Sequence, residues 1–377
     1  MVTHLNFYIV AFYSRILPGT RQVMKTADFD FSESSTIIPS DPVDLRGKTR
    51  ESGRMVVLDR GADSVTHSVF SSIIDYFHPG DLLVLNDSYV MSNSILFKHG
   101  DIPVLVSLLG HEPEGTTAIE VLGELDPQPG LTIMCKDDPQ LSCTLISQRP
   151  DTLWKARFEP VERLMPALDA FGTRTDETMN IDLRLWHTKN DSYRSVYAKS
   201  PGSLDIPSAG LHFSAELLDS IARKGVEIAY ITLHVGTAES LDVSLISAEE
   251  IENHKMTAEY FEVGDEAAAQ INRAMAEKRR IVGVGTTVLR TLESLAVLQA
   301  PKTPVKAKSG WTDIYIYPGF EFKVVDALLT NLHRPRSSHI VLTAAFANKE
   351  IVMRSYAEIL EMGGYEFDMF GDSMLIV

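Results

Sequence analysis

The apolar positions in the second half of the chain alternate between the spacing of a helix and the spacing of a strand. A helix is expected from Ser214, placed to cap it, to Gly225, placed to end it, and a strand is expected at 226–233. Residues 281–284 predict a buried strand, and the helix that follows has one apolar face. The inward positions of that face are Val288, Leu289, Leu292, Leu295 and Ala296. This alternation predicts an α/β domain.

The first part of the chain shows the same alternation on a smaller scale. Short apolar runs at 55–58 and 81–85 predict two strands, and the apolar spacing at 69–77 between them suits a helix. Pro79 and Gly80 would end that helix. We therefore expect a strand, helix, strand unit here.

Between about residues 94 and 160 the pattern changes to short apolar runs without helices between them. Turn-rich pieces such as 111–115 and 126–130 separate these runs. The runs are 104–109, 118–122, 131–135, 141–146 and 153–158. Strands at this spacing predict a small antiparallel barrel or sandwich.

The whole pattern predicts a discontinuous α/β domain interrupted by an all-β insert. Residues 1–93 would form its N-terminal part, 94–160 the inserted β-barrel domain, and 161–377 its main part. Residues 1–27 are interpreted as an N-terminal extension whose order the pattern does not determine.

Composition and charge narrow the class of protein. A chain of 377 residues, 44% hydrophobic and 23% charged, is long enough for two domains with full cores and is ordinary for a soluble globular protein. The formal charge of −16, from 35 basic and 51 acidic residues, gives a mean field that repels phosphate backbones, although a local basic patch could still bind them. Charge alone therefore does not predict a nucleic-acid partner.

Cysteine usage and the N-terminal segment point to the cytoplasm. Cys135 and Cys143 lie in predicted strands and are interpreted as a buried pair of small apolar side chains, with no disulfide framework. The apolar segment 5–13 is far shorter than the roughly 20 residues of a membrane span, and it lacks the flanks of a signal peptide. We expect a cytoplasmic protein.

Glycine-marked polar segments follow several of the predicted strands, which is where α/β proteins build their sites. The segment 283–287 ends a strand and opens a helix, so backbone N–H groups and two threonine hydroxyls would converge on a carboxylate or other anion. The segment lacks the lysine of a phosphate loop and the three glycines of a dinucleotide site. A tight turn capped by threonine is an equally good interpretation. Arg290 and Glu293, one turn apart on this helix, could simply pair on its surface.

Four histidines lie beside Gly, Pro or Asn at expected strand ends or turns: His212, His234, His254 and His333. An imidazole there can accept or deliver a proton near neutral pH. The spacing of metal ligands is missing, so a metal site is the weaker alternative. For any one of the four, a core position satisfied by a backbone hydrogen bond is at least as good an interpretation. Glu259 is either a partner of His254 or a solvated strand carboxylate.

A series of collinear strings resembles the S-adenosylmethionine:tRNA ribosyltransferase-isomerase family of the queuosine pathway. The strings are YRSVYAKSPGSLDIPSAGLHF, GVEIAYITLHVG, ENHKMTAEYFEV, VGVGTTVLRTLES, IYIYPGFEFKVVDALLTNLHRPRSS and GDSMLI, preceded by DFDF, MVVLDRG and PGDLLVLND. The resemblance covers about residues 28 to 377. So many unrelated short motifs rarely recur in order by chance.

The resemblance implies a fold and a reaction. The fold is a larger α/β domain with an inserted β-barrel. In the reaction, S-adenosylmethionine gives its ribosyl portion to the aminomethyl group of a 7-deazaguanine in a tRNA anticodon, and adenine and methionine leave. A sulfonium acidifies the adjacent ribose C–H, so a positioned base can start the rearrangement without a metal or redox cofactor.

The resemblance also implies roles for individual residues. Proton transfer falls to His212, His234 and His254, with Glu259 in support. The wall for S-adenosylmethionine is Gly285, Thr286, Thr287, Arg290 and Glu293, where the helix start and the arginine hold the methionyl carboxylate. Asn331 and His333 belong to the same pocket. Asn86, Asp87 and Asp372 are candidates for binding ribose or base edges.

The chain departs from the family pattern at several segments. The family's NDTRV reads Asn86-Asp-Ser-Tyr-Val90, so a guanidinium suited to phosphate or base contact is missing. PLPPYI is absent, and the segments at 234–238, 254–257 and 331–338 differ from HVGLGTF, HKMH and NFHLPKST. These losses cluster on expected acceptor contacts. Two alternatives therefore stay open: a relative that uses S-adenosylmethionine on a small-molecule or nucleoside acceptor, and a non-catalytic binding protein.

Overall fold

The computed structural model describes residues 23–90, 93–112, 116–149, 153–172, 191–236, 245–298 and 304–377. Contacts within the chain group it into two compact units. The larger unit holds residues 25–90 and 186–377, and the smaller one is centred on residues 91–185. In the described residues, no helix is long and apolar enough to cross a membrane.

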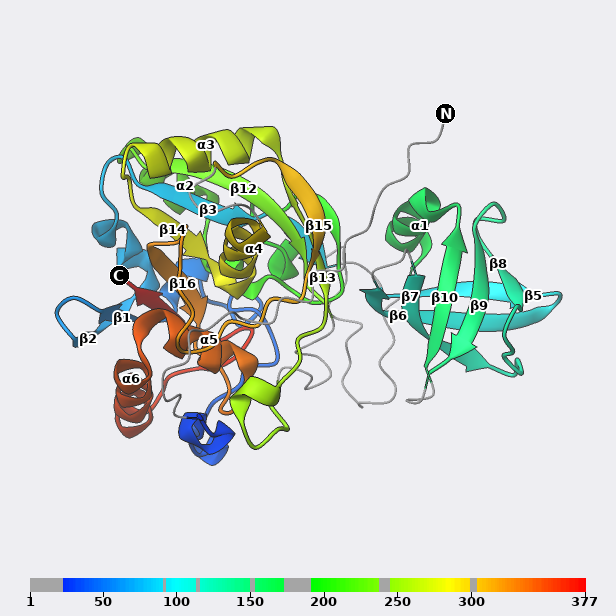
Figure 1. Cartoon of the computed structure of the whole chain (residues 1–377), viewed down its shortest axis with the longest axis horizontal. Helices are drawn as coiled ribbons and strands as arrows, with labels where there is room; N and C mark the ends of the chain where they lie inside the picture. The colour runs from blue at the N-terminus through cyan, green and yellow to red at the C-terminus, as the bar shows by residue number, and fades with distance from the viewer. Residues whose placement is uncertain are drawn as a thin grey trace. The chain divides into compact units, whose positions relative to one another are not determined.

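The larger unit is a mixed α/β structure built on a nine-stranded sheet (Figure 1). In order across the sheet, the strands are β15 (Lys308–Thr312), β13 (Glu259–Val263), β12 (Glu227–His234), β3 (Leu82–Asn86), β14 (Ile281–Val284), β16 (Ala327–Asn331), β17 (Ser373–Ile376), β1 (Arg54–Asp59) and β2 (Ser64–Val69). The central strands β12, β3, β14 and β16 are parallel to one another. Their carboxyl ends therefore meet at one edge, where open α/β sheets place their ligand sites.

Helices cover both faces of this sheet. On one face, Leu83 and Leu85 of β3 join a core with Phe213 and with Ile221 of helix α2 (Ala215–Arg223). The other face carries α4 (Gly285–Leu298) beside α3 (Asp265–Ala276). Gly283 of β14 allows α4 to pack closely, because a Cβ there would lie 3.4 Å from the side chain of Val288.

The remaining helices of the larger unit lie near the C-terminus. Helix α5 (Ser338–Ala347) packs against α6 (Lys349–Met362), and α6 contacts β1 and β2. A small two-stranded sheet pairs β4 (Ser88–Val90) with β11 (Ser200–Ser203). Short 3-10 turns precede the sheet and connect its strands: Thr26–Phe29, Glu33–Ser35, Arg50–Ser52, Phe70–Tyr76, Asp191–Tyr193, Ser208–His212 and Ile251–Asn253.

The smaller unit contains a closed antiparallel barrel. Its strands follow the order β10 (Trp154–Glu159), β7 (Thr116–Gly123), β6 (Ile102–Glu112), β5 (Ser94–His99), β8 (Thr132–Cys135) and β9 (Ser142–Gln148). Every second residue of β8 and β10 is buried, as expected for a filled barrel. Cys135 and Cys143 are free and buried, as the sequence predicted. The 3-10 turn Val161–Arg163 leads into helix α1 (Leu164–Phe171), which contacts β5.

The local predictions of the second half are confirmed. Ser214 accepts a hydrogen bond from the N–H of Leu217 at 3.0 Å and caps α2, and β12 follows. Strand β14 is buried throughout, and helix α4 buries the apolar face predicted for it, with Ala296 half-buried at its end.

Two predictions in the first half were incomplete or wrong. The segment 69–77 was expected to be an α-helix, but it is a 3-10 helix, Phe70–Tyr76, preceded by the unpredicted edge strand β2. Phe70 and Ile73 are both buried and lie three residues apart, which is the period of a 3-10 helix. The five predicted barrel strands are present, but β5 was missed as the sixth.

Candidate active site

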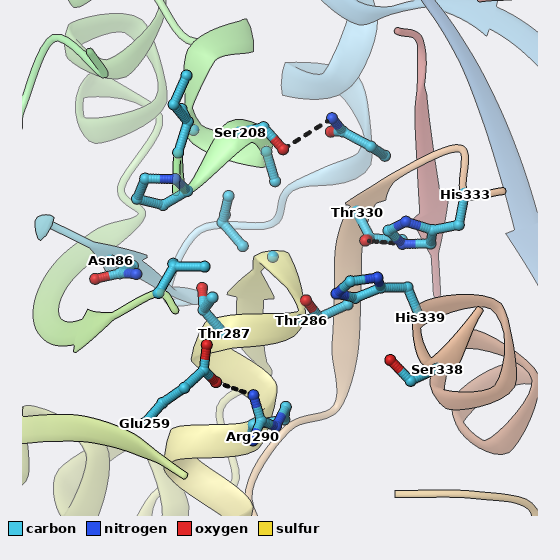
Figure 2. A pocket seen from close by; sticks show the side chains of 18 of the residues that line it. Asn86, Ser208, Glu259, Thr286, Thr287, Arg290, Thr330, His333, Ser338 and His339 are labelled. Carbon is cyan, nitrogen blue, oxygen red and sulfur yellow. Dashed lines mark hydrogen bonds and ion pairs between the residues drawn. The ribbon is translucent and has the colours of Figure 1, made fainter. Parts of the chain in front are cut away.

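A pocket lies at the carboxyl ends of the four parallel strands (Figure 2). Its wall includes Asn86 from the end of β3, Val235 after β12, Gly285 after β14 and Asn331 from the end of β16. Its empty volume is about 860 Å³ when the open mouth is included, a size suited to a small-molecule ligand. The sheet topology thus brings together segments that lie more than 200 residues apart.

The start of helix α4 forms one side of the pocket. Gly285 has a φ of +86°, a conformation that favours glycine, and an added Cβ would lie 3.3 Å from the Thr287 hydroxyl. Thr286 and Thr287 line the pocket and are half-buried. The first backbone N–H groups of a helix lack partners within it and favour a negative charge. The predicted glycine-threonine turn therefore exists and opens onto a pocket.

A second helix also begins at this pocket. Ser337 caps α5 by accepting a hydrogen bond from the N–H of Ile340 at 3.2 Å. Ser338 and His339, in the first turn, both line the pocket. Two helix N-termini thus face the same space, and their dipoles act together on any anionic group bound between them.

Arg290 and Glu259 form a buried ion pair on the pocket wall, drawn with a dashed line in Figure 2. Their side chains are only 7% and 5% exposed. Glu259 also accepts a hydrogen bond from the N–H of Gly236 at 3.0 Å, so it is neither a solvated carboxylate nor hydrogen-bonded to His254. The Nε of Arg290 donates to the carbonyl of Ile314 at 3.3 Å.

One donor of this arginine is left over. The Nη2 of Arg290 is buried and has no hydrogen-bond partner among the described residues. A buried guanidinium N–H without a partner is costly, and a ligand carboxylate would satisfy it. The donor set of the pocket thus fits an anionic group.

The suggested surface pair between Arg290 and Glu293 is wrong. Glu293 is fully buried and accepts hydrogen bonds from the N–H groups of Lys323, Val324 and Val325 at 2.9, 3.0 and 3.1 Å. Burial raises its pKa, and these three donors act in the opposite direction. Glu293 thus anchors the backbone of residues 323–325. It is not among the described residues that line the pocket.

Among the described residues, three imidazoles line the pocket. The Nε2 of His333 shares a hydrogen bond with the Thr330 hydroxyl at 2.8 Å, and its ring stacks on that of His339 with centroids 5.0 Å apart. The ring of His254 packs against Tyr315 with centroids 5.2 Å apart. Figure 2 shows the stacked pair beside the Thr286 side chain.

Burial lowers the pKa of each of these histidines. The pKa of His333 lies well below its ordinary value, and that of His254 is also lowered. Burial, assisted by the charge of Arg290, lowers the pKa of His339 to about 4. All three rings are therefore neutral at pH 7 and carry a lone pair that can accept a proton.

His212 lies behind the pocket wall, in a second, adjoining hollow that also contains Asp372. Its Nε2 donates to the Oδ1 of Asn331 at 3.2 Å, and its ring stacks on Phe70 with centroids 4.9 Å apart. Burial lowers its pKa to about 4. Asn331 and Ser208, hydrogen-bonded to each other at 3.2 Å, stand between the two spaces.

Two other residues predicted to belong to the site, Asp87 and His234, are not among the described residues that line the pocket. The Asp87 carboxylate accepts a hydrogen bond from the Thr232 hydroxyl at 2.7 Å. The Nδ1 of His234 shares a hydrogen bond with the Ser88 hydroxyl at 3.1 Å. Asn86, which does line the pocket, ties β3 to β12 through two 3.0 Å hydrogen bonds with the backbone of Leu233.

Sequence reasoning missed Ser208, Tyr197 and His339 on the pocket wall. A signal for His339 was present, because the capping serine before 338 places it in the first turn of a helix. The hydroxyl of Tyr197 sits against Gly210, where an added Cβ would lie 2.2 Å from it.

Across the described ranges, no group of three or more His, Cys, Asp or Glu side chains is arranged to hold a metal ion.

Comparison with known proteins identifies the family. The model of the family described as "Queuosine biosynthesis protein" matches residues 26–376. The S-adenosylmethionine:tRNA ribosyltransferase-isomerase of Heliobacterium modesticaldum is 36% identical over 356 residues, which cover 94% of this chain and 100% of the relative. The enzyme of the same name from Thermotoga petrophila shows the same identity and coverage.

A solved structure agrees with these sequence relatives. The crystal structure of an S-adenosylmethionine tRNA ribosyltransferase from Thermotoga maritima is 31% identical, with a TM-score of 0.52, and the match covers 93% of this chain and 100% of that one. The family model and the relatives each span nearly the whole chain. The chain therefore belongs to the queuosine biosynthesis protein family.

Proposed function

We propose that this protein is an S-adenosylmethionine:tRNA ribosyltransferase-isomerase. It transfers and isomerises the ribosyl portion of S-adenosylmethionine onto the 7-aminomethyl-7-deazaguanine of tRNA to give epoxyqueuosine, and it releases adenine and methionine. The relatives that carry this enzyme name match over their full length, which supports the proposal. Their names favour tRNA over the smaller acceptor considered from the sequence.

One observation carries the donor side of the proposal: the pocket offers an unsatisfied buried Arg290 Nη2 beside two helix N-termini. S-adenosylmethionine is a co-substrate with a carboxylate at one end and a sulfonium in the middle. Its methionyl carboxylate would take the Arg290 donor and the N–H groups at the start of α4, with the hydroxyls of Thr286 and Thr287 beside it. No metal takes part in this proposal.

Proton transfer is assigned to the neutral imidazoles of the pocket. The sulfonium acidifies a C–H of the bound ribose, and a neutral ring can take that proton because its lone pair is free. Of the histidines singled out from the sequence, His254 and His333 line the pocket, and we place His254 in this role. Glu259 supports the site by neutralising Arg290.

The barrel is proposed to be a separate inserted domain. Its closed strand order and the grouping of contacts into two units support this assignment. The boundaries that the sequence suggested, 94 and 160, would be extended to include helix α1, because α1 contacts β5. The tRNA substrate named for the relatives also supports a cytoplasmic location.

The deciding experiment follows adenine by chromatography. The protein is incubated with S-adenosylmethionine, with and without precursor tRNA that carries the aminomethyl base. Adenine release that requires this tRNA is the expected result. Release with a free nucleoside or with no acceptor would favour the small-acceptor enzyme, and donor binding without release would favour a binding protein.

A further inference from the structure

A second hollow adjoins the main pocket at the same edge of the sheet. Its empty volume is about 390 Å³, and Ser208 lines both spaces. Gly53, just before β1, and Asp372, just before β17, contribute to its wall together with His212. A group bound in this hollow would therefore lie next to a donor bound in the main pocket.

Asp372 contributes a buried carboxyl group to this hollow. One of its oxygens accepts a hydrogen bond from the N–H of Arg54 at 2.6 Å and the other from the N–H of Glu366 at 2.8 Å. Burial raises its pKa to about 6. At neutral pH the buried carboxylate is ionised, which costs desolvation free energy. A further hydrogen-bond donor or a cation beside it would reduce that free-energy cost.

The hydrogen bonds around Asn331 determine the tautomer of His212. The Nδ2 of Asn331 donates to Ser208 and to the carbonyls of Asp368 and Met369 at 3.1 and 3.0 Å, so its Oδ1 faces His212. The neutral imidazole must then carry its proton on Nε2, the atom that donates to this oxygen. Its Nδ1 is left as a hydrogen-bond acceptor.

Both acceptors face the small space that Gly53 leaves open. A Cβ added to Gly53 would lie 3.4 Å from the Oδ1 of Asp372 and 3.8 Å from the Nδ1 of His212. The charged side chains that line the hollow are three carboxylates, Asp44, Glu366 and Asp372, and two guanidinium groups, Arg46 and Arg50. Each guanidinium is paired with a carboxylate, Arg46 with Glu366 at 2.6 Å and Arg50 with Asp44 at 3.3 Å. Among the described residues that line the hollow, Asp372 is thus the carboxylate without a guanidinium partner. Of the charges that act on it, that of Glu366 raises its pKa, and that of Arg54, which does not line the hollow, lowers its pKa.

We propose that this hollow binds a primary amine in its ammonium form, with Asp372 and the Nδ1 of His212 as acceptors. The inference rests on the proposed function, because the amine would be the aminomethyl group of the acceptor base. An ammonium offers three N–H donors and a positive charge, so two of its donors would bind these two acceptors and its charge would be balanced by Asp372. Ser208 lines both spaces, so the amine would approach the ribosyl group of the donor there. Before it reacts, the ammonium gives one proton to the Asp372 carboxylate, which frees the nitrogen lone pair.

The test is Gly53→Ala, which places a methyl group between the two acceptors. Gly53 has a φ of −62°, so alanine fits the backbone without strain. We expect the KM for precursor tRNA to rise at least about tenfold while the Kd for S-adenosylmethionine, measured by calorimetry, stays within about twofold. The matched control is Gly264→Ala, where φ is −74° and an added Cβ meets nothing within 4 Å. It should change neither quantity.

A second variant, Asp372→Asn, keeps the size and removes the charge, and its amide nitrogen leaves one of the two backbone N–H groups that bind Asp372 without an acceptor. In the wild-type protein the KM for precursor tRNA should rise as pH falls below about 6, because protonation of Asp372 removes the charge that holds the ammonium. Asp372→Asn should start with a high KM and lose this part of the pH dependence. A merely structural role for the carboxyl would not produce that change in profile.

The outcomes separate the inference from the function on which it rests. If the wild-type protein releases no adenine with precursor tRNA, the proposed function falls and the inference falls with it. If it does, an unchanged tRNA KM in Gly53→Ala overturns the inference alone. Loss of S-adenosylmethionine binding in Gly53→Ala would also overturn it, since the hollow would then belong to the donor.

Discussion

At the scale of single residues, the pocket separates side chains that can touch a ligand from side chains that hold the structure together. Thr287 and Arg290 both line the pocket, and Arg290 retains an unsatisfied donor. The carboxylate of Glu293, on the same helix, accepts hydrogen bonds from three backbone N–H groups. Residue type alone could not distinguish these roles, because each depends on a partner from elsewhere in the chain.

We predict that Thr287→Val weakens donor binding by about five- to tenfold, as expected for one lost hydrogen bond of about 1 kcal/mol. The substitution keeps the volume and removes the hydroxyl that lines the pocket. Calorimetry with S-adenosylmethionine measures the effect. The control is Thr291→Val on the same helix, whose hydroxyl donates to the backbone carbonyl of Thr287 at 2.9 Å. Equal affinities in Thr287→Val and the wild-type protein would exclude this hydroxyl from the donor site.

We predict that His254→Gln lowers the kcat for adenine release by about 10²- to 10⁴-fold, the range typical of a lost general base. Donor affinity should change by less than about tenfold, because the glutamine still fills the wall. His234→Gln is the comparison, since His234 is hydrogen-bonded to Ser88 outside the pocket wall. A larger loss of kcat in His234→Gln than in His254→Gln would reverse the assignment of the base.

At the scale of elements, two strand-to-helix junctions build the pocket. The junction of β14 and α4 was predictable, because Gly283-Val-Gly-Thr-Thr287 contains both its turn and its hydroxyls. The start of α5 was not selected from the sequence, although Ser337 caps it. The 3-10 helix Phe70–Tyr76 escaped prediction because two buried positions three residues apart fit an α-helix equally well.

We predict that Gly285→Ala destabilises the protein by about 1–2 kcal/mol and also weakens donor binding. The positive φ of +86° strains any L side chain, and the new Cβ would press on the Thr287 hydroxyl. Urea unfolding and calorimetry measure the two effects. Gly319→Ala is the matched control, because its φ is +101° and an added Cβ meets nothing within 4 Å. Gly319→Ala should lose a similar amount of stability and keep full donor affinity. If Gly319→Ala also lost donor affinity, the loss in Gly285→Ala would be explained by reduced stability of the whole protein.

At the scale of the whole molecule, folding buries several histidines in their neutral form. Burial lowers the pKa of His212 to about 4, whereas an unfolded histidine titrates near 6.5. Between these values the unfolded chain binds more protons, so stability falls as pH decreases from 6.5 towards 4. The site that needs a neutral imidazole therefore makes the fold sensitive to acid.

We predict that His212 accounts for about 3 kcal/mol of this loss, which is the pKa difference multiplied by 1.36 kcal/mol per unit. Urea unfolding at several pH values between 4 and 7.5 gives the free energies. His212→Gln should show a smaller slope than the wild-type protein below pH 6.5. His78→Gln, in which a 73% exposed side chain is replaced, serves as the control and should leave the slope unchanged. Identical slopes in all three proteins would contradict a buried neutral His212.

The amino-acid sequence by itself determined the features that depend on neighbours along the chain. These are the cap and stop of α2, the strand and helix around Gly285, five of the six barrel strands, and the short strings shared with the family. Each is a matter of local periodicity or turn chemistry, which a few adjacent residues specify.

Only the tertiary structure decided which side chains meet. Glu259 pairs with Arg290 across 31 residues, and His212 donates to Asn331 across 119. Asn331 and Ser208 thereby divide the site into two spaces, and His339 joins the larger one. These contacts follow from the order of strands in the sheet, because parallel strands bring their carboxyl ends to one edge whatever their separation in the sequence.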